Sequence, residues 1–70
     1  MFVYEKVRAY LEQGGIKQSF VADKIGMSMS TFNAIMCGNR KLYADDLRQI
    51  CYSLNVSPEK FIEFEPNDST

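Results

Sequence analysis

The stretch from Gln18 to Gly38, with the sequence QSFVADKIGMSMSTFNAIMCG, constrains the fold of this chain more than any other part. Apolar side chains recur in it with helical spacing, in one run made of Val21, Ala22 and Ile25 and a second made of Phe32, Ile35 and Met36. Each run predicts one buried face of a short helix. Between the runs, Gly26 can adopt the positive φ that ends a helix, and Ser28 can accept hydrogen bonds from the free N–H groups that begin the next one. The pattern predicts a helix-turn-helix, in which the second helix is the candidate reader of DNA.

Three further helices are expected around this unit. Apolar stripes predict one before it and one after it, and the pair Ser57-Pro58 marks the start of a short last helix. The expected helices span residues 2–13, 18–25, 29–37, 44–54 and 58–64. No strand signal interrupts this series, so the sequence predicts an all-α fold of five short helices around one core. The domain is expected at residues 1–64 and a polar tail at residues 65–70.

Composition narrows the class of protein further. The chain has 70 residues, of which 46% are hydrophobic and 24% charged, the balance of one small globular domain. No apolar run approaches the ~20 residues that span a bilayer, and no signal peptide opens the chain, so a cytoplasmic location is expected. Cys37 and Cys51 occur without a CxxC pair or any histidine, which predicts two reduced thiols and neither a metal site nor a cofactor. The lack of a nucleophile–base pair and of a Gly-rich phosphate loop argues against an enzyme.

The distribution of charge matters more than the net charge of −1, which by itself disfavours a nucleic-acid partner. Residues 14–42 contain four basic side chains and one aspartate, a net charge of +3. The remainder contains four basic side chains and eight carboxylates, a net charge of −4. The positive part coincides with the predicted helix-turn-helix. Such a separation can orient a protein on a phosphate backbone while it limits non-specific binding.

Four blocks of sequence, in their order and spacing, are similar to the lambda repressor-like helix-turn-helix family, also described as Cro/cI or XRE type. They are Gln18, VADKIGM at residues 21–27, Gly38 and SLNVSPEKF at residues 53–61. The similar segment covers about residues 3–62, nearly the whole chain. The resemblance implies that the third helix lies in the major groove of double-stranded DNA and that the first helix packs behind it.

The resemblance also implies roles for single residues. In that family the first, second and sixth residues of the recognition helix face the base edges, and here these are Met29, Ser30 and Ala34. The exposed face of the same helix adds Asn33, whose amide carries the donor and the acceptor that suit adenine. The expected phosphate-binding residues lie at the two ends of the helix-turn-helix and in its turn, and they are Lys17, Gln18, Ser28, Cys37, Arg40, Lys41 and Tyr43.

The chain departs from the family pattern at two places. Many relatives begin the recognition helix with a glutamine that is braced by the glutamine of the preceding helix. Here Met29 stands at that position, so Gln18 is expected to have nothing to brace. Many relatives also pair an arginine near the end of the first helix with a glutamate late in the third. Leu11 and Met36 occupy these positions, and because both are apolar we predict a buried Leu11–Met36 contact in place of the ion pair.

The chemistry of the reading face predicts weak discrimination at each base. Met29 and Ala34 offer apolar contact, for which the thymine methyl group is the partner in the major groove. Ser30 can donate to or accept from a purine edge, and a strong guanine contact would have to come from Arg40. The hypothesis is therefore a site rich in thymine, with a large share of the affinity supplied by phosphates.

Two functions from different classes fit these features. The first is a sequence-specific transcriptional regulator, a repressor of prokaryotic or phage type, that binds a partly palindromic operator as a homodimer. The second is a protein-interaction module with the same fold, such as an antirepressor or an antitoxin-like partner. This alternative is favoured by an exposed Phe20, by Met29, by the acidic isoelectric point and by the loss of the glutamine reader. Apolar surface for a dimer is expected in the fifth helix, where Phe61, Ile62 and Phe64 compete for one core.

Overall fold

The computed structural model of the chain describes residues 2–62, and all the regular structure in them is helical. The elements are α1 (Val3–Gly14), α2 (Gln18–Ile25), α3 (Met29–Met36), α4 (Ala44–Leu54) and the short 3₁₀ helix η1 (Pro58–Lys60). The predicted all-α fold is confirmed, and the helix-turn-helix of α2 and α3 lies where the sequence indicated. Within the described residues, no helix is both long and apolar enough to cross a membrane.

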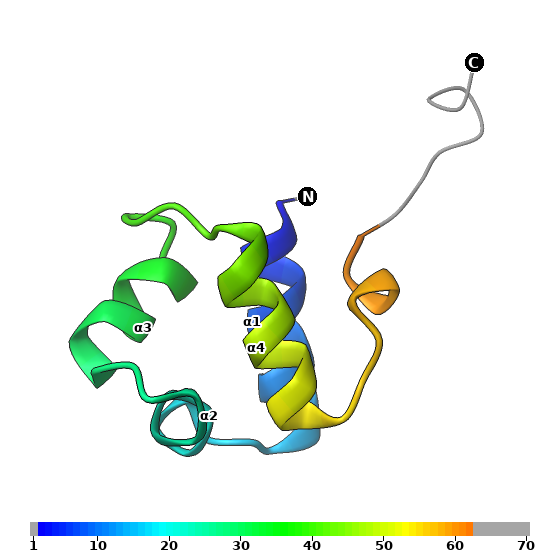
Figure 1. Cartoon of the computed structure of the whole chain (residues 1–70), viewed down its shortest axis with the longest axis horizontal. Coiled ribbons are helices and arrows are strands. Elements are labelled where there is room, and N and C mark those ends of the chain that lie inside the picture. The colour runs from blue at the N-terminus through cyan, green and yellow to red at the C-terminus, as the bar shows by residue number, and fades with distance from the viewer. Residues whose placement is uncertain (1, 63–70) are drawn as a thin grey trace.

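Helix α3 lies at one end of the molecule, on the far side from η1 (Figure 1). The packing between elements explains this position. Helix α3 packs on α1 and on α2, while α2 also packs on α4, and η1 packs on α4. The rest of the domain therefore supports α3 along one side and leaves its other side at the surface.

The turn between α2 and α3 has the geometry that its residues predict. Gly26 ends α2 with a φ of 72°, in the left-handed region where an amino acid with a Cβ atom is strained. The Ser28 hydroxyl then accepts a hydrogen bond from the backbone N–H of Thr31 at 3.2 Å, which caps the start of α3. Asn55 closes α4 in the same left-handed conformation, with a φ of 59°, as expected from its position. Local residue chemistry thus sets the end of α2, the start of α3 and the end of α4.

A single buried cluster holds the helices together. Its members come from every α-helix and from the segment after η1, and they are Val7, Leu11, Val21, Ala22, Phe32, Ile35, Met36, Leu47, Ile50, Cys51 and Phe61. Within the described residues, no polar or charged side chain is buried. Leu11 and Met36 both belong to this cluster and lie on helices that pack together, which is the placement that the predicted Leu11–Met36 contact requires.

The fifth helix is shorter and tighter than predicted. Ser57 caps it as expected, but the helix covers Pro58–Lys60 and is of the 3₁₀ type instead of an α-helix over residues 58–64. The backbone N–H of Phe61 bonds to the carbonyl of Pro58, three residues back, and Phe61 then turns into the core with 2% of its surface exposed. Its ring meets Tyr10 edge-on, with centroids 5.5 Å apart. Burial of Phe61 against α1 therefore decides the conformation here, and helix propensity does not.

The remaining differences in the elements are small. Helix α3 ends at Met36, with Cys37 as its C-cap, and α1 covers Val3–Gly14 in place of residues 2–13. Phe64 and the predicted polar tail at residues 65–70 lie outside the described residues.

Replacing Leu11 by arginine tests the apolar connection between α1 and α3. Leu11 is almost fully buried, so a guanidinium there would be an unpaired charge among apolar side chains. We expect Leu11→Arg to lower the free energy of unfolding by about 3 kcal/mol or more, measured by urea denaturation. The matched control is Glu12→Arg at the adjacent exposed position, where we expect a change within about 0.5 kcal/mol. Equal effects of the two changes would contradict the predicted Leu11–Met36 contact.

Candidate nucleic-acid interface

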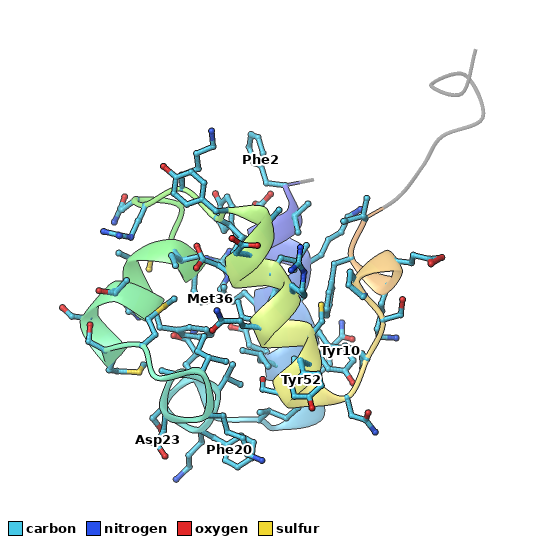
Figure 2. All side chains as sticks on the ribbon, in the orientation of Figure 1. Phe2, Tyr10, Phe20, Asp23, Met36 and Tyr52 are labelled. Atoms are coloured by element: carbon cyan, nitrogen blue, oxygen red, sulfur yellow. The ribbon has the colours of Figure 1, made fainter. Side chains whose placement is uncertain are left out.

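Helix α3 separates its apolar and polar side chains onto opposite faces. Phe32, Ile35 and Met36 are fully buried, and Figure 2 shows Met36 pointing from α3 into the interior. The opposite face carries the four predicted base-reading residues. Met29, Ser30 and Asn33 are exposed, Met29 to 43%, and Ala34 is half-buried. The structure thus brings these four side chains together on one solvent-facing surface, which we call the reading face.

A chain of polar contacts connects this face to the start of α2. The Asn33 amide donates from Nδ2 to Oε1 of Gln18 at 3.5 Å, and the Cys37 thiol donates to Oδ1 of Asn33 at 3.7 Å. The expectation that Gln18 has nothing to brace is therefore wrong. The reason is the helical repeat, because Asn33 lies four residues after Met29 and so occupies nearly the same side of α3.

These contacts use only part of the hydrogen-bonding capacity of the Asn33 amide. An amide has two N–H donors and an oxygen with two lone pairs, and one donor and one lone pair are taken by Gln18 and Cys37. One N–H and one lone pair therefore remain, and a donor with an acceptor is what N7 and N6 of adenine require. Gln18 accepts through its oxygen, so its own N–H groups remain available to a phosphate.

Predicted phosphate-binding residues lie on both sides of the reading face. Lys17 is exposed as the N-cap of α2, and Arg40 and Lys41 are exposed in the loop that follows α3. Tyr43, with 57% of its surface exposed, follows them at the N-cap of α4. The Lys41 ammonium lies 5.4 Å from the centre of the Tyr43 ring, which keeps the two side chains together at the surface.

Arg8, a residue not predicted from the sequence to belong to the site, holds the end of α3 in place. Its Nη1 atom donates a hydrogen bond of 2.8 Å to the backbone carbonyl of Met36, in a partly buried position. A cation at this end of a helix is favourable because the last carbonyls are unpaired and carry partial negative charge. The sequence does contain a sign of this role. Arg8 lies about one helical turn before the buried Leu11, and therefore on the side of α1 that faces α3.

Tyr4 supports the same helix end from α1. The Arg8 guanidinium lies 5.9 Å from the centre of the Tyr4 ring. Gly38, just after α3, has a φ of 81°, and a Cβ atom added there would lie 2.5 Å from the Tyr4 hydroxyl oxygen. Glycine is thus favoured at position 38 by its conformation, and the Tyr4 side chain would have to move to make room for a Cβ atom.

The two cysteines differ in their surroundings. Both are free thiols; Cys51 is buried in α4 and Cys37 is exposed beside the reading face. Burial raises the pKa of the Cys51 thiol, so the protonated form is favoured and its reactivity as a thiolate is low. Within the described residues, no cluster of histidine, cysteine and carboxylate side chains could hold a metal ion.

Comparison with known protein families matches residues 6–67 to the Cro/C1-type HTH DNA-binding domain. The match spans most of the chain and includes α2, α3 and the loop with Arg40 and Lys41. The chain belongs to this family of DNA-binding domains. Comparison with curated proteins and with solved structures finds no match. Family membership thus agrees with the lambda repressor-like resemblance carried by the sequence blocks, and it concerns a family of DNA-binding domains rather than of enzymes.

Replacing Arg8 by alanine tests the connection between α1 and the end of α3. Loss of a partly buried hydrogen bond from a charged donor is expected to lower the free energy of unfolding by about 1–3 kcal/mol. Arg48→Ala is the matched control, because Arg48 is 75% exposed and its contact with Asp45 is a surface ion pair 3.6 Å long. We expect a change of about 0.5 kcal/mol or less for that control. Hydrogen exchange should also accelerate at the amides of Cys37 and Gly38 in Arg8→Ala, and unchanged protection there would argue against this role.

Proposed function

We propose that this protein is a sequence-specific DNA-binding transcriptional regulator, a repressor of prokaryotic or phage type that acts in the cytoplasm. The observation that carries the proposal is the arrangement of α3 in a chain of this family. Its three large apolar side chains are buried, and its opposite face is at the surface with basic residues on both sides. A helix supported in this way can enter the major groove while the flanking residues contact the backbone. Repression follows when the bound protein occludes the polymerase.

Phosphate contacts supply most of the affinity in this proposal. Arg40, Lys41 and Tyr43 bind the backbone beyond the C-terminal end of α3. Lys17 and the Gln18 amide bind it near the start of α2, where the free N–H groups of the helix also favour an anion. The hydroxyl of Ser28 and the thiol of Cys37 complete the set at the two ends of α3. The acidic remainder of the chain limits binding to DNA in the wrong orientation.

The reading face then provides the specificity. Met29 and Ala34 contact thymine methyl groups, and Ser30 bonds to a purine edge. Asn33 reads an adenine with the remaining N–H and lone pair of its amide, and Gln18 holds that amide in the required orientation. This brace takes the place of the glutamine pair of many relatives, with the reading amide moved from the first residue of the helix to the fifth.

A two-fold dimer matches this reading face to a partly palindromic operator. One short recognition helix reads few base pairs, so two copies with half-sites ~34 Å apart increase both the affinity and the length of sequence that is read. The apolar surface around Ile62 and the exposed Phe2 are the places where a second copy could pack.

A protein-interaction module is the second candidate, favoured by the surface of α2. Phe20 is 51% exposed and points away from the domain (Figure 2), with the Lys24 ammonium 5.2 Å from the centre of its ring. An aromatic ring beside a cation is typical of a protein contact. The salt dependence of binding distinguishes the two functions. A DNA binder with several phosphate contacts loses affinity steeply between about 50 and 200 mM salt, and a partner bound through apolar surface does not.

Selection of bound sequences from random DNA tests the proposed function. We expect enrichment of a thymine-rich motif at low salt. Arg40→Ala should weaken binding to all sequences by a similar factor, because a phosphate contact does not depend on the base. Ser30→Ala should relax the preference mainly at one position, with a loss of about 1–3 kcal/mol of discrimination there. No enrichment at low salt would favour the protein-interaction module, and an invariant guanine opposite Met29 would contradict the thymine hypothesis.

A double-mutant cycle tests whether Gln18 positions Asn33. Asn33→Ala should reduce the preference for adenine at one position of the selected motif, again by about 1–3 kcal/mol. Gln18→Ala should reduce the same preference in part, and the two changes together should cost less than their sum because they act on one contact. Gln49→Ala, an exposed glutamine on α4, is the control and should leave the preference unchanged. Strict additivity of Gln18→Ala and Asn33→Ala would show that the pair does not act as a unit.

A further inference from the structure

A groove that the proposed DNA interface does not use lies between the end of α2 and the later part of α4, two helices that pack together. It has a volume of about 430 Å³ and is open to solvent. Its lining consists of Lys24, Ile25, Arg48, Gln49, Tyr52 and Ser53. We call this surface the α2–α4 groove. None of these residues belongs to the reading face or to the proposed phosphate-binding set.

Two aromatic side chains enlarge the apolar surface at the groove. Tyr52 lines it with 88% of its surface exposed, more than any other large hydrophobic side chain among the described residues. Phe20 lies one turn before Lys24, and the Lys24 ammonium is 5.2 Å from the centre of its ring. Figure 2 shows Phe20 and Tyr52 in the same lower part of the view. Neither ring belongs to the buried cluster, and exposed aromatic surface of this kind is typical of a binding site for a partner.

The charge of the groove is positive on both sides. Lys24 on α2 and Arg48 on α4 line it, and none of its lining residues is acidic, although the chain as a whole has a net charge of −1. Among the described residues, Lys24 forms no ion pair. Arg48 contacts Asp45 at 3.6 Å, but both side chains are at least 75% exposed. Because such a surface pair contributes little, a carboxylate from a partner can replace Asp45 at small cost.

We propose that the α2–α4 groove binds a protein partner through an acidic segment that carries an apolar side chain between carboxylates. The apolar side chain packs on Ile25 and Tyr52, and the carboxylates on either side pair with Lys24 and Arg48. Tyr52 supplies the largest share of the affinity, since tyrosine is enriched at the energetic centres of interfaces, and the ion pairs mainly orient the segment. The inference goes beyond the proposed DNA-binding function, and it gives the second candidate function a surface and a partner chemistry.

The position of the groove allows the partner and DNA to bind at the same time. The proposed phosphate contacts use the starts of α2 and α4, at Gln18 and Tyr43, and the groove uses later residues of the same helices, such as Ile25 and Tyr52. The helical rise separates the two sets by ~10 Å along α2 and ~13 Å along α4. The partner therefore binds to the DNA-bound protein and does not displace it from DNA.

Selection of random peptides that bind the full chain tests the chemistry of the partner. The probe is a displayed library of dodecapeptides. We expect enrichment of sequences that combine aspartate or glutamate with leucine or phenylalanine, because these side chains complement the cations and the apolar surface of the groove. Enrichment of basic or uncharged peptides would overturn the proposal, and so would the absence of enrichment.

Substitutions in the groove test where an enriched peptide binds. Its affinity, measured by fluorescence anisotropy, should fall about 10-fold in Tyr52→Ala. The double change Lys24→Glu and Arg48→Glu should lower it by at least about 10-fold, because attraction becomes repulsion. All three side chains are exposed, so the free energy of unfolding should change by little and the loss can be assigned to binding.

Matched controls make the same kinds of change among the proposed phosphate-binding residues. They are Tyr43→Ala and the double change Lys17→Glu and Lys41→Glu, all at exposed positions. These variants should lower the affinity for the peptide much less than the groove variants do. Equal losses in the two groups would place the peptide outside the groove or show a general charge effect, and would overturn the proposal.

Two other occupants of the groove give different results. Self-association of the full chain in analytical ultracentrifugation that Tyr52→Ala abolishes would identify a second copy. A single-stranded oligonucleotide that displaces the peptide, and that loses affinity in the Lys24→Glu and Arg48→Glu variant, would identify a nucleic acid. Either result would overturn the proposal.

A DNA duplex separates this inference from the proposed function. The affinity for the peptide should be unchanged when a duplex from the DNA selection is bound, and loss of the peptide on addition of the duplex would overturn the inference. If no duplex binds while the peptide binds in the groove, the proposed DNA-binding function fails and this inference stands. If a duplex binds and no peptide does, this inference fails and the proposed function stands.

Discussion

The burial of one face of α3 is the constraint on which the rest of the structure depends. An isolated helix of eight residues does not form in water, because its nucleation costs more than its few hydrogen bonds return. Phe32, Ile35 and Met36 supply the missing stabilisation by packing into the core shared with α1, α2 and α4. The same burial fixes the rotation of α3 about its axis. Once these three side chains are inside, Met29, Ser30 and Asn33 have to face outward.

The support of α3 combines apolar contact with one charged hydrogen bond. Leu11 and Met36 occupy the positions where many relatives have an ion pair, and both are buried. An ion pair replaced as a whole by apolar side chains costs little, because no unpaired charge remains. A cation is still present in this region, because Arg8, one turn before Leu11 on α1, donates a hydrogen bond to the Met36 carbonyl. This chain thus holds the end of α3 through its backbone, a contact that does not depend on the side chain at position 36.

The candidate interface combines a reading face without charged side chains and flanking residues that are basic. The side chains of the reading face are small or flexible, and the Asn33 amide is the one held by contacts on both sides. In the proposed complex, the loop with Arg40 and Lys41 determines how tightly DNA is held, and the reading face determines which DNA is held. Regulation through that loop would alter affinity without altering specificity.

Local sequence determined the helices, their ends and the family. The spacing of apolar residues predicted the four α-helices, and Gly26, Ser28 and Asn55 predicted where they stop and start, because these features depend on neighbours within one or two turns. The tertiary structure decided the rest. Burial of Phe61 against Tyr10 turned the expected fifth α-helix into η1, the approach of α2 to α3 paired Gln18 with Asn33, and the packing of α1 brought Arg8 to Met36. Each of these contacts joins residues far apart in the chain, and a local pattern carries no information about such distances.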